Sequence, residues 1–510
     1  MRVAIGKFAV VVVVALLASC AKNPVTGKNE LMLVGAAWEL DIGKKQYAPL
    51  RQSQGGDYEV DPGVERYVRE VGNRLAAVSD RKLPYEFNVI NSSVPNAWAL
   101  PGGKISINRG LLTEMRSEAE LAAVLAHEIV HSAAKHGARA QSRGSLLQLA
   151  AVGTAVGLSS ELGAQGAQML GSVGAQLINQ SYGRKAERES DDYGMLYMSR
   201  AGYDPQGAVD LQETFVKLSG NAKKNLMTKF FASHPVSQNR VKANKARAAT
   251  LPKGGTVGRD SYRKAMARLM RSKPAYDAYD EGNKIYKSNK SKSVALVKKA
   301  IRLEPKEAMF HAALGDIANN EKKYKTARTH YNRAIKLDDD YFYYFLRRGQ
   351  VNQLTKNYSA AKRDLNKSIE LLPTADAHAL LGETALGLND RATAVNQFKI
   401  AARDRSAVGQ AAYGRLMQLD LADNPNAYIA TQTGISQKGT LAVKLSNPTP
   451  KTVTGVQFTI TLKSNGQSTV RRVRGVIEPG KARILDTGIK ALKEHLPSYQ
   501  IKVTTARVAK

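Results

Sequence analysis

The sequence of 510 residues predicts a multidomain protein: a mainly α-helical domain with a small β element, then an α-solenoid, then a C-terminal β-sandwich. Three observations lead to this fold class. The chain is too long for one compact core, an internal repeat recurs in its later half, and its last part alternates apolar and polar residues with a period of two. We expect these divisions: residues 1–19 (signal peptide), 20–250 (first domain), 251–275 (linker), 276–423 (repeats) and 424–510 (sandwich).

The start of the chain resembles a bacterial lipoprotein signal. An apolar run at residues 8–18 fits the hydrophobic region of a secretory signal and is too short to span a bilayer. The run ends in LASC (residues 17–20), which resembles a lipobox and predicts lipidation of Cys20, the only cysteine in the sequence. Ala21 in place of Asp favours, by analogy with Gram-negative lipoproteins, an outer-membrane lipoprotein that faces the periplasm.

The chain is also strongly basic. Its 76 Lys and Arg residues against 44 Asp and Glu residues give a formal charge of +32. Such a charge attracts polyanions, among them nucleic acid, anionic lipid or lipopolysaccharide, and acidic protein. Because the signal predicts export, we exclude nucleic acid as a partner and assign the charge to envelope polyanions or to solubility. The lipid anchor makes the membrane itself a partner.

The first domain is predicted to be mainly helical. Residues 61–81 have helical periodicity, and residues 85–112 indicate strands around a Pro- and Gly-containing loop. Ser117 and Glu120 have the spacing of a capping box, so a helix is expected from there to Gly137. This helix is apolar nearly all round, which is typical of a buried helix.

The repeat region follows. The motif AIRL at residues 300–303 recurs as AIKL at 334–337 and as SIEL at 368–371, and several other columns keep the same offset. This pattern resembles the tetratricopeptide repeat, which implies stacked helix pairs with a concave binding face. Beyond it, alternating apolar positions such as Leu441, Val443 and Leu445 predict the strands of a small antiparallel sandwich, with packing or docking as its default role.

The sequence HEIVH places three functional side chains on the buried helix. His127 and His131 are one turn apart and project from the same face, so they can share one Zn²⁺, while Glu128 can deprotonate a bound water. The alternative is an alanine-rich core helix with satisfied polar groups. Three ionisable groups on such a helix would be costly without a ligand to hold, which favours the metal site.

A catalytic zinc needs a third protein ligand. The metzincin spacing fails, because His136 lies one residue short of the required position, and Glu161 is the only acid between residues 132 and 186. Glu187 and Asp191 lie four apart on a predicted helix, so one can bind zinc while the other orients a ligand histidine. We expect Glu187 to be the ligand and Asp191 to be the orienting member of the catalytic set. Two further acids of this helix, Glu189 and Asp192, are expected to point to solvent.

These elements together resemble the M48 family of zinc metallopeptidases over residues 21–250. HEIVH is followed by ERESDDYG, AGYDP and FFASHPVSQNR in an order and spacing similar to that family. The resemblance implies one zinc per chain on the three ligands, Glu128 as general base, and a role in outer-membrane protein quality control. Two departures are Val130, where the family usually has Gly, and the added sandwich. For His234 the resemblance implies a fourth zinc ligand that inhibits the enzyme, and the alternative is a packing or capping histidine.

The expected function is therefore a zinc endopeptidase of the bacterial envelope. It would degrade misfolded or stalled outer-membrane and periplasmic proteins, with the repeats docking substrates or the outer-membrane assembly machinery. The segment 99–109 could be an edge strand that pairs with an extended substrate. The alternative is a chaperone or scaffold lipoprotein with a latent or structural zinc site, which would not need Glu128. A third, weaker hypothesis is a binder of lipopolysaccharide or peptidoglycan.

Overall fold

A computed structural model describes residues 20–154, 182–220 and 234–509. The predicted signal peptide and Glu161 lie outside these described residues. The chain divides into two compact units, residues 1–344 and 345–510. Within the described part of the chain, no helix combines the length and the apolarity needed to cross a membrane.

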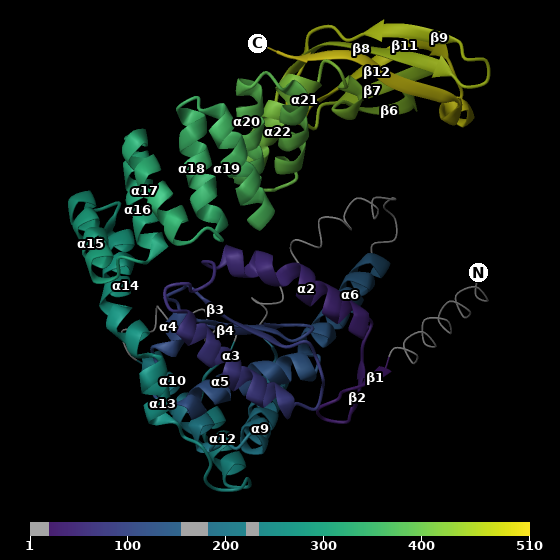
Figure 1. Ribbon diagram of the computed structural model, residues 1–510. Coiled ribbons are helices and arrows are strands. Elements are labelled where there is room, and N and C mark those ends of the chain that lie inside the picture. The colour runs from purple at the N-terminus through teal and green to yellow at the C-terminus, as the bar shows by residue number, and fades with distance from the viewer. Residues whose placement is uncertain (1–19, 155–181, 221–233, 510) are drawn as a thin grey trace, which may run out of the picture. The chain divides into compact units, whose positions relative to one another are not determined.

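A three-stranded sheet lies at the centre of the first unit (Figure 1). Strand β5 (Lys104–Asn108) occupies its middle, parallel to β3 (Glu86–Ile90) and antiparallel to β4 (Ala97–Leu100). The prediction of an edge strand over 99–109 is therefore wrong for most of that segment, because β5 is hydrogen-bonded on both sides. The edge position belongs to β4.

Helices cover both faces of this sheet. Side chains alternate along β4: Trp98 and Leu100 pack against α2 (Ala36–Ser53), while the small Ala97 and Ala99 belong to the core on the opposite face. That core contains α3 (Pro62–Ala77), whose N-cap Asp61 accepts a hydrogen bond from Gly63 N, and α5 (Glu118–Ala133). The short elements nearby are β1 (Cys20–Lys22), β2 (Asn29–Leu31) and α4 (Arg109–Leu112).

Helix α5 carries the HEIVH sequence and begins as predicted. The Oγ of its N-cap Ser117 accepts a hydrogen bond from Glu120 N at 3.2 Å, although the Glu120 carboxylate binds Arg116 N rather than completing a capping box. The helix ends at Ala133, not at Gly137, because Lys135 adopts a left-handed conformation with φ of 57°. A new helix, α6 (His136–Thr154), then changes direction.

The linker predicted for 251–275 is instead part of the first domain. The carbonyls of Val257 and Gly258 accept hydrogen bonds from Ala119 N and Glu118 N, which are among the unpaired donors at the start of α5. Tyr262 of α13 (Arg259–Ala265) is buried in the same core as α5. The chain then continues directly into α14 (Ala267–Ile285), the first helix of the repeat region.

The repeats form successive helix pairs. Matched columns in the sequence correspond to contacts inside a pair: a glycine of the first helix faces a large side chain of the second, as Gly315 faces Tyr331 and Gly382 faces Phe398. In the first unit the helices after α14 are α15 (Lys290–Leu303), α16 (Ala308–Asn320) and α17 (Tyr324–Leu337). Helix α18 (Phe342–Leu354) crosses the boundary, and the second unit continues with α19 (Tyr358–Leu371), α20 (Ala375–Gly387), α21 (Arg391–Ala401) and α22 (Ala407–Asp420).

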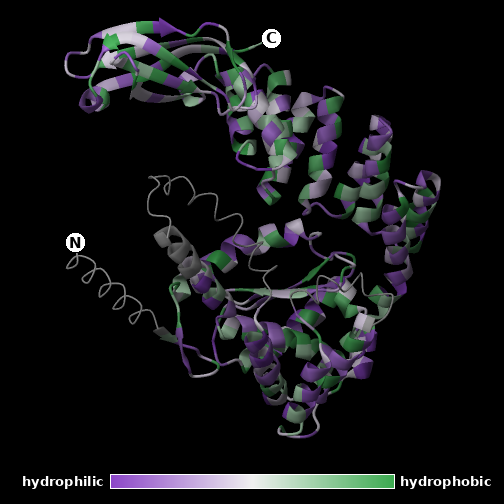
Figure 2. Ribbon diagram, turned by 180° about the vertical axis from the view of Figure 1, so that it is seen from behind, coloured by the Kyte–Doolittle hydropathy of each residue, from purple (hydrophilic) through white to green (hydrophobic). Residues whose placement is uncertain are grey.

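The C-terminal region consists of two antiparallel sheets with one shared core. One sheet has the order β11–β7–β6 and the other β10–β8–β12, with β9 also paired to β8. Alternation along these strands is visible as changing hydropathy in Figure 2 and places Val443 and Phe458 inside. The strands are β6 (Ala430–Ile435), β7 (Thr440–Ser446), β8 (Val453–Leu462), β9 (Ser468–Arg472), β10 (Val476–Ile477), β11 (Ala482–Lys490) and β12 (Tyr499–Val508).

Candidate metal centre

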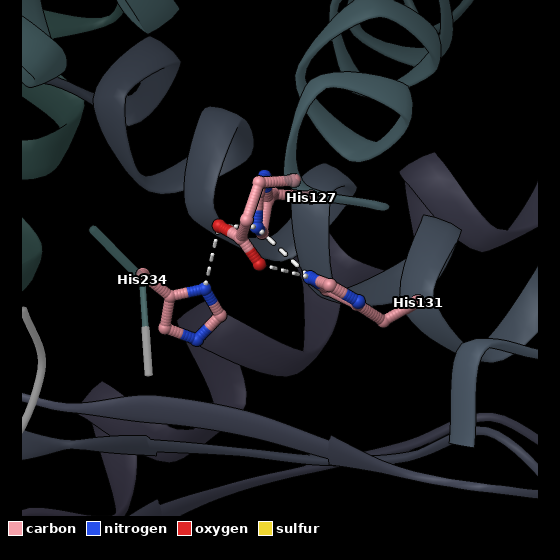
Figure 3. A group of neighbouring side chains, drawn as sticks. His127, His131 and His234 are labelled. Carbon is pink, nitrogen blue, oxygen red and sulfur yellow. Dashed lines mark hydrogen bonds and ion pairs between the residues drawn. The ribbon is translucent and has the colours of Figure 1, made fainter. Parts of the chain in front are cut away.

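Three helices of the first domain bring the predicted site residues together. His127 and His131 lie on α5, Glu187 lies on α9 (Arg184–Arg200), and His234 lies shortly before α12 (Gln238–Ala248). One ligand atom from each of these four residues lies within 4.8 Å of the others. In Figure 3 the three labelled histidine rings surround a common point.

The spacing of the ligand atoms fits a metal ion. The Nε2 atoms of His127 and His131 are 3.0 Å apart, and the Glu187 oxygens lie 3.5 and 3.4 Å from these two nitrogens. Ligands at about 2.0–2.1 Å from a tetrahedral zinc are themselves separated by roughly 3.4 Å. Glu187 Oε1 is buried and has no hydrogen-bond donor among the described residues. A bound cation would give this oxygen the partner that a buried polar atom needs.

The approach of α9 to α5 depends on a glycine. Glu187, Asp191 and Gly194 follow one another at helical spacing and share one face of α9. A Cβ added at Gly194 would lie 3.3 Å from the backbone nitrogen of His127. Glycine at this position therefore allows the two carboxylates to reach the histidines of the neighbouring helix.

Asp191 supports His127. Its Oδ1 lies 3.0 Å from His127 Nδ1, so the ring donates from Nδ1 and directs Nε2 to the cluster. Arg240 holds the same carboxylate with two hydrogen bonds, Nε to Oδ2 at 2.8 Å and Nη2 to Oδ1 at 2.7 Å. Burial, the largest single effect, would raise the pKa of Asp191, but the charge of Arg240 and the hydrogen bonds from His127 and Arg240 together outweigh it and lower that pKa. Arg240 also donates to Pro235 O at 2.9 Å, which fixes the segment next to His234.

His131 has a different support, which the sequence interpretation missed. Its Nδ1 lies 2.8 Å from His136 Nδ1, and His136 Nε2 lies 3.3 Å from Glu189 Oε1. Glu189 was predicted to be solvated, and this is wrong: it is 7% exposed and faces the first turn of α6. Asp192, also predicted to point to solvent, is exposed. The sequence contained one signal of this support: a third histidine, His136, five residues after His131.

The protonation of the two histidines differs. Burial lowers the pKa of His131 to about 3, so its ring is neutral and offers a lone pair. Burial also acts to lower the pKa of His127, but hydrogen bonds to Asp191 and Glu187 raise it to about 10. The pKa of Glu187, which burial would raise, is held well below its usual range by the charge of His234 and by the histidine hydrogen bonds. A metal ion bound here would be held by an ionised carboxylate and would require His127 in its neutral form.

Glu128 and His234 face the same centre. Glu128 is 2% exposed and His234 is 5% exposed, and His234 Nε2 lies 3.6 Å from Glu128 Oε1. His234 Nδ1 lies 3.2 Å from Glu187 Oε2. His234 is thus in the cluster itself, at the position from which a fourth ligand would act.

A small cavity of about 40 Å³ adjoins His127, Glu128 and His234. Its wall is mainly apolar and comes from α9 and α10 (Gln206–Gly220), with Met195, Met198, Leu211 and Phe215 among the lining residues. Val130, which stands where the family usually has Gly, is fully buried in the domain core and does not line this cavity. Tyr182 stacks on His131, with the two ring centroids 4.2 Å apart.

Comparison with known proteins assigns both regions. The sequence profile of Peptidase family M48 matches residues 62–248, and that of the tetratricopeptide repeat matches residues 310–341. The chain is 30% identical over 228 residues to the putative beta-barrel assembly-enhancing protease of Vibrio cholerae, covering 43% of this chain and 46% of that protein. It is 35% identical over 181 residues to the mitochondrial metalloendopeptidase OMA1 of Schizosaccharomyces pombe, covering 34% of this chain and 50% of that protein.

The chain thus spans about half the length of these two relatives. Metalloprotease YcaL of Escherichia coli is matched over more of its length: it is 30% identical over 206 residues, covering 38% of this chain and 78% of that protein. The M48 profile includes every residue of the cluster, from His127 to Arg240. The chain therefore belongs to peptidase family M48.

Proposed function

We propose that this protein is a zinc-dependent endopeptidase with one zinc per chain, built on a zincin-like domain and followed by a docking solenoid and a β-sandwich. The observation that carries the proposal is the convergence of His127, His131 and Glu187, with buried Glu128 beside them. Two imidazole nitrogens and one carboxylate oxygen are a donor set typical of catalytic zinc. A purely structural site would not need Glu128.

Each residue has a defined task in peptide hydrolysis. These ligands would hold a zinc ion, which would supply a water of pKa about 7 and would polarise the scissile carbonyl. Glu128 accepts the proton of the attacking water at its carboxylate and passes it to the leaving amine. Asp191 keeps His127 in the tautomer that directs Nε2 to the centre, and the apolar cavity beside Glu128 suits an apolar substrate side chain.

His234 acts in this proposal as a latch. Three protein ligands leave one position for water, and an imidazole at that position blocks hydrolysis until it moves. His234 lies within reach of both Glu187 and Glu128 in the described conformation. The adjoining cavity of about 40 Å³ is too small for a bulky side chain, so displacement of His234 would also enlarge the substrate site.

The cellular role follows from the signal, the repeats and the relatives. Lipidation at Cys20 would hold the protein at the outer membrane, facing the periplasm. Unfolded or misassembled envelope proteins are the proposed substrates, and the repeats would dock them or the outer-membrane assembly machinery. The name of the Vibrio cholerae relative, beta-barrel assembly-enhancing protease, supports this assignment. The alternative remains a chaperone or scaffold with a latent zinc site.

The deciding experiment uses Glu128→Gln. This variant keeps the size of the side chain and lacks a base, so it should retain one zinc while losing cleavage of an unfolded protein substrate. Wild-type protein and Asp192→Asn, an exposed acid of the same domain, serve as controls. Equal cleavage by Glu128→Gln and wild type would reject the peptidase mechanism, and zinc-loaded wild type and His234→Ala proteins that are both inactive would favour the scaffold.

The latch has its own test. His234→Ala should cleave the same substrate faster than wild type, and should cleave itself, while zinc content stays near one per chain. His234→Ala combined with Glu128→Gln should be inactive. Lost activity with intact zinc in the single variant would instead assign His234 to transition-state stabilisation.

A further inference from the structure

A buried chain of hydrogen bonds leads from His131 to the first described residues of the protein. His131 Nδ1 contacts His136 Nδ1 at 2.8 Å, His136 Nε2 contacts Glu189 Oε1 at 3.3 Å, and Asn23 Nδ2 donates to the same oxygen at 3.0 Å. All of these side chains are nearly inaccessible: Asn23 is 0% exposed, His136 2% and Glu189 7%. Asn23 and Glu189 are 166 residues apart in the sequence.

The direction of the protons along this chain is determined by its two ends. With a metal bound at Nε2 of His131, the hydrogen of the neutral ring lies on Nδ1 and is donated to His136. His136 then accepts at Nδ1 and donates from Nε2 to the Glu189 carboxylate. Glu189 therefore fixes the tautomer of His136, and His136 fixes that of His131. A carboxylate commonly does this directly for a zinc-bound histidine, and here one imidazole lies between the two.

Asn23 joins this chain to a hairpin formed by β1 and β2. Its Oδ1 accepts from Val25 N at 2.9 Å and Thr26 N at 3.3 Å, so the side chain organises the turn. Its Nδ2 is shared between Glu189 and Glu30 of β2, with 3.0 Å to each. Arg139 pairs with Glu30 and lies 3.5 Å from Glu189, which places a positive charge beside both carboxylates.

We propose that the hairpin of residues 20–31 is a working part of the metal centre, in which Asn23, through Glu189 and His136, positions the ring of His131 for the metal. The proposal rests on the zinc site of the proposed function. His136, Glu189 and Asn23 are positioning residues, since none of them faces the substrate side. Buried polar atoms from the hairpin, α6 and α9 form one hydrogen-bond network, so the position of each side chain depends on the others. A histidine that only filled space in the core would not need such a network.

The test compares substitutions of His136 that keep its contact with His131, its contact with Glu189, or neither. In His136→Asn, the side-chain oxygen occupies about the place of Nδ1 and can still accept from His131. In His136→Gln, the amide nitrogen reaches about the place of Nε2 and contacts Glu189 only, and His136→Leu makes neither contact. Zinc affinity of the full chain is measured by competition with a chelator, and the visible spectrum of the Co²⁺-substituted protein reports the ligand geometry.

We expect His136→Leu and His136→Gln to weaken zinc binding by roughly 10–100-fold, with an altered Co²⁺ spectrum, and His136→Asn to retain more of the affinity. Asn23→Ala should weaken binding in the same direction by a smaller factor, whereas the matched control Asn29→Ala, an exposed asparagine of the same hairpin, should not. Thermal unfolding of the zinc-free proteins identifies any variant that fails to fold.

Equal affinity for zinc in folded His136→Leu and wild type would overturn the proposal, as would equal losses in the Asn and Gln variants. These outcomes are distinct from failure of the proposed function. Wild-type and His234→Ala proteins that both bind zinc without peptidase activity would reject the latter, while the effect of His136 on affinity and on the Co²⁺ spectrum would still be measured.

Discussion

The two histidines of HEIVH stand one turn apart on the same helix, yet their supports end in different parts of the sequence. His127 is held by one carboxylate, Asp191, which Arg240 of the downstream helix α12 grips with two hydrogen bonds. His131 is held by another imidazole, His136, and behind it by Glu189 and the upstream hairpin. The first support places a carboxylate directly on the histidine, whereas the second inserts a further imidazole between the histidine and its carboxylate. Closely spaced ligands can thus depend on separate parts of a fold.

The largest effect should come from Glu187, the proposed ligand that both histidines face. Glu187→Ala removes the only carboxylate within the ligand cluster, so zinc affinity should fall by more than the roughly 10–100-fold typical of an outer partner, and peptidase activity should be lost. Elemental analysis after purification measures the loss. Full zinc content in this variant would show that another residue is the third ligand. The two histidines would then not share the centre on which the comparison of their supports depends.

Removal of the metal should have the second-largest effect, a loss of stability. A ligand present at a hundred to a thousand times its Kd stabilises the native state by about 3–4 kcal/mol, so excess chelator should lower the thermal midpoint of the wild type. The buried Glu187 carboxylate and the adjoining imidazoles would then lack their shared cation. Glu187→Ala is the control, because its midpoint should barely respond. An equal shift in both proteins would show that the chelator acts at another site.

The two supports should differ in what their carboxylates contribute to folding. Asp191→Ala leaves Arg240 buried, with the Glu187 carboxylate at 3.2 Å as its remaining ion-pair partner among the described residues. We therefore expect a loss of about 3 kcal/mol, the lower end for a broken buried ion pair. Glu189→Ala should cost less, because Arg139 retains Glu30. Urea unfolding of both zinc-free variants measures the difference. A greater loss in Glu189→Ala would reverse the proposed ranking of the two supports.

The sequence predicted the support of His127 and missed that of His131 for a physical reason. Glu187, Asp191 and the two HEIVH histidines lie at helical spacings, so their shared faces follow from periodicity alone. His136 reaches His131 only because Lys135 takes a left-handed conformation that ends α5 and starts α6. Asn23 and Glu189 meet across the fold, and no local pattern marks such a contact.

The same distinction applies to the fold. Helix pairs in the repeats, the N-cap at Ser117 and the alternation along β7 and β8 are local patterns, and each of these elements is present in the structure. The supposed linker and the edge strand were misplaced because their positions depend on pairing with distant segments. Val257 and Gly258 close the start of α5, and β5 lies between β3 and β4.

The smallest expected effects come from removing helix N-caps. They test whether zinc affinity depends on the support of His127 or on helix α5, which carries both histidines. Ser117→Ala removes the N-cap of α5 and should cost about 1 kcal/mol, leaving zinc affinity unchanged because both histidines stay on an intact helix whose first donors still bind Val257 and Gly258. Ser237→Ala removes the equivalent cap of α12, where Ser237 accepts from Arg240 N at 3.2 Å, at a similar cost. Only the second change loosens the residue that grips Asp191, so Ser237→Ala should weaken zinc binding slightly more than Ser117→Ala in the same chelator competition. The reverse order would mean that α5 itself, rather than α12, determines how firmly His127 is held.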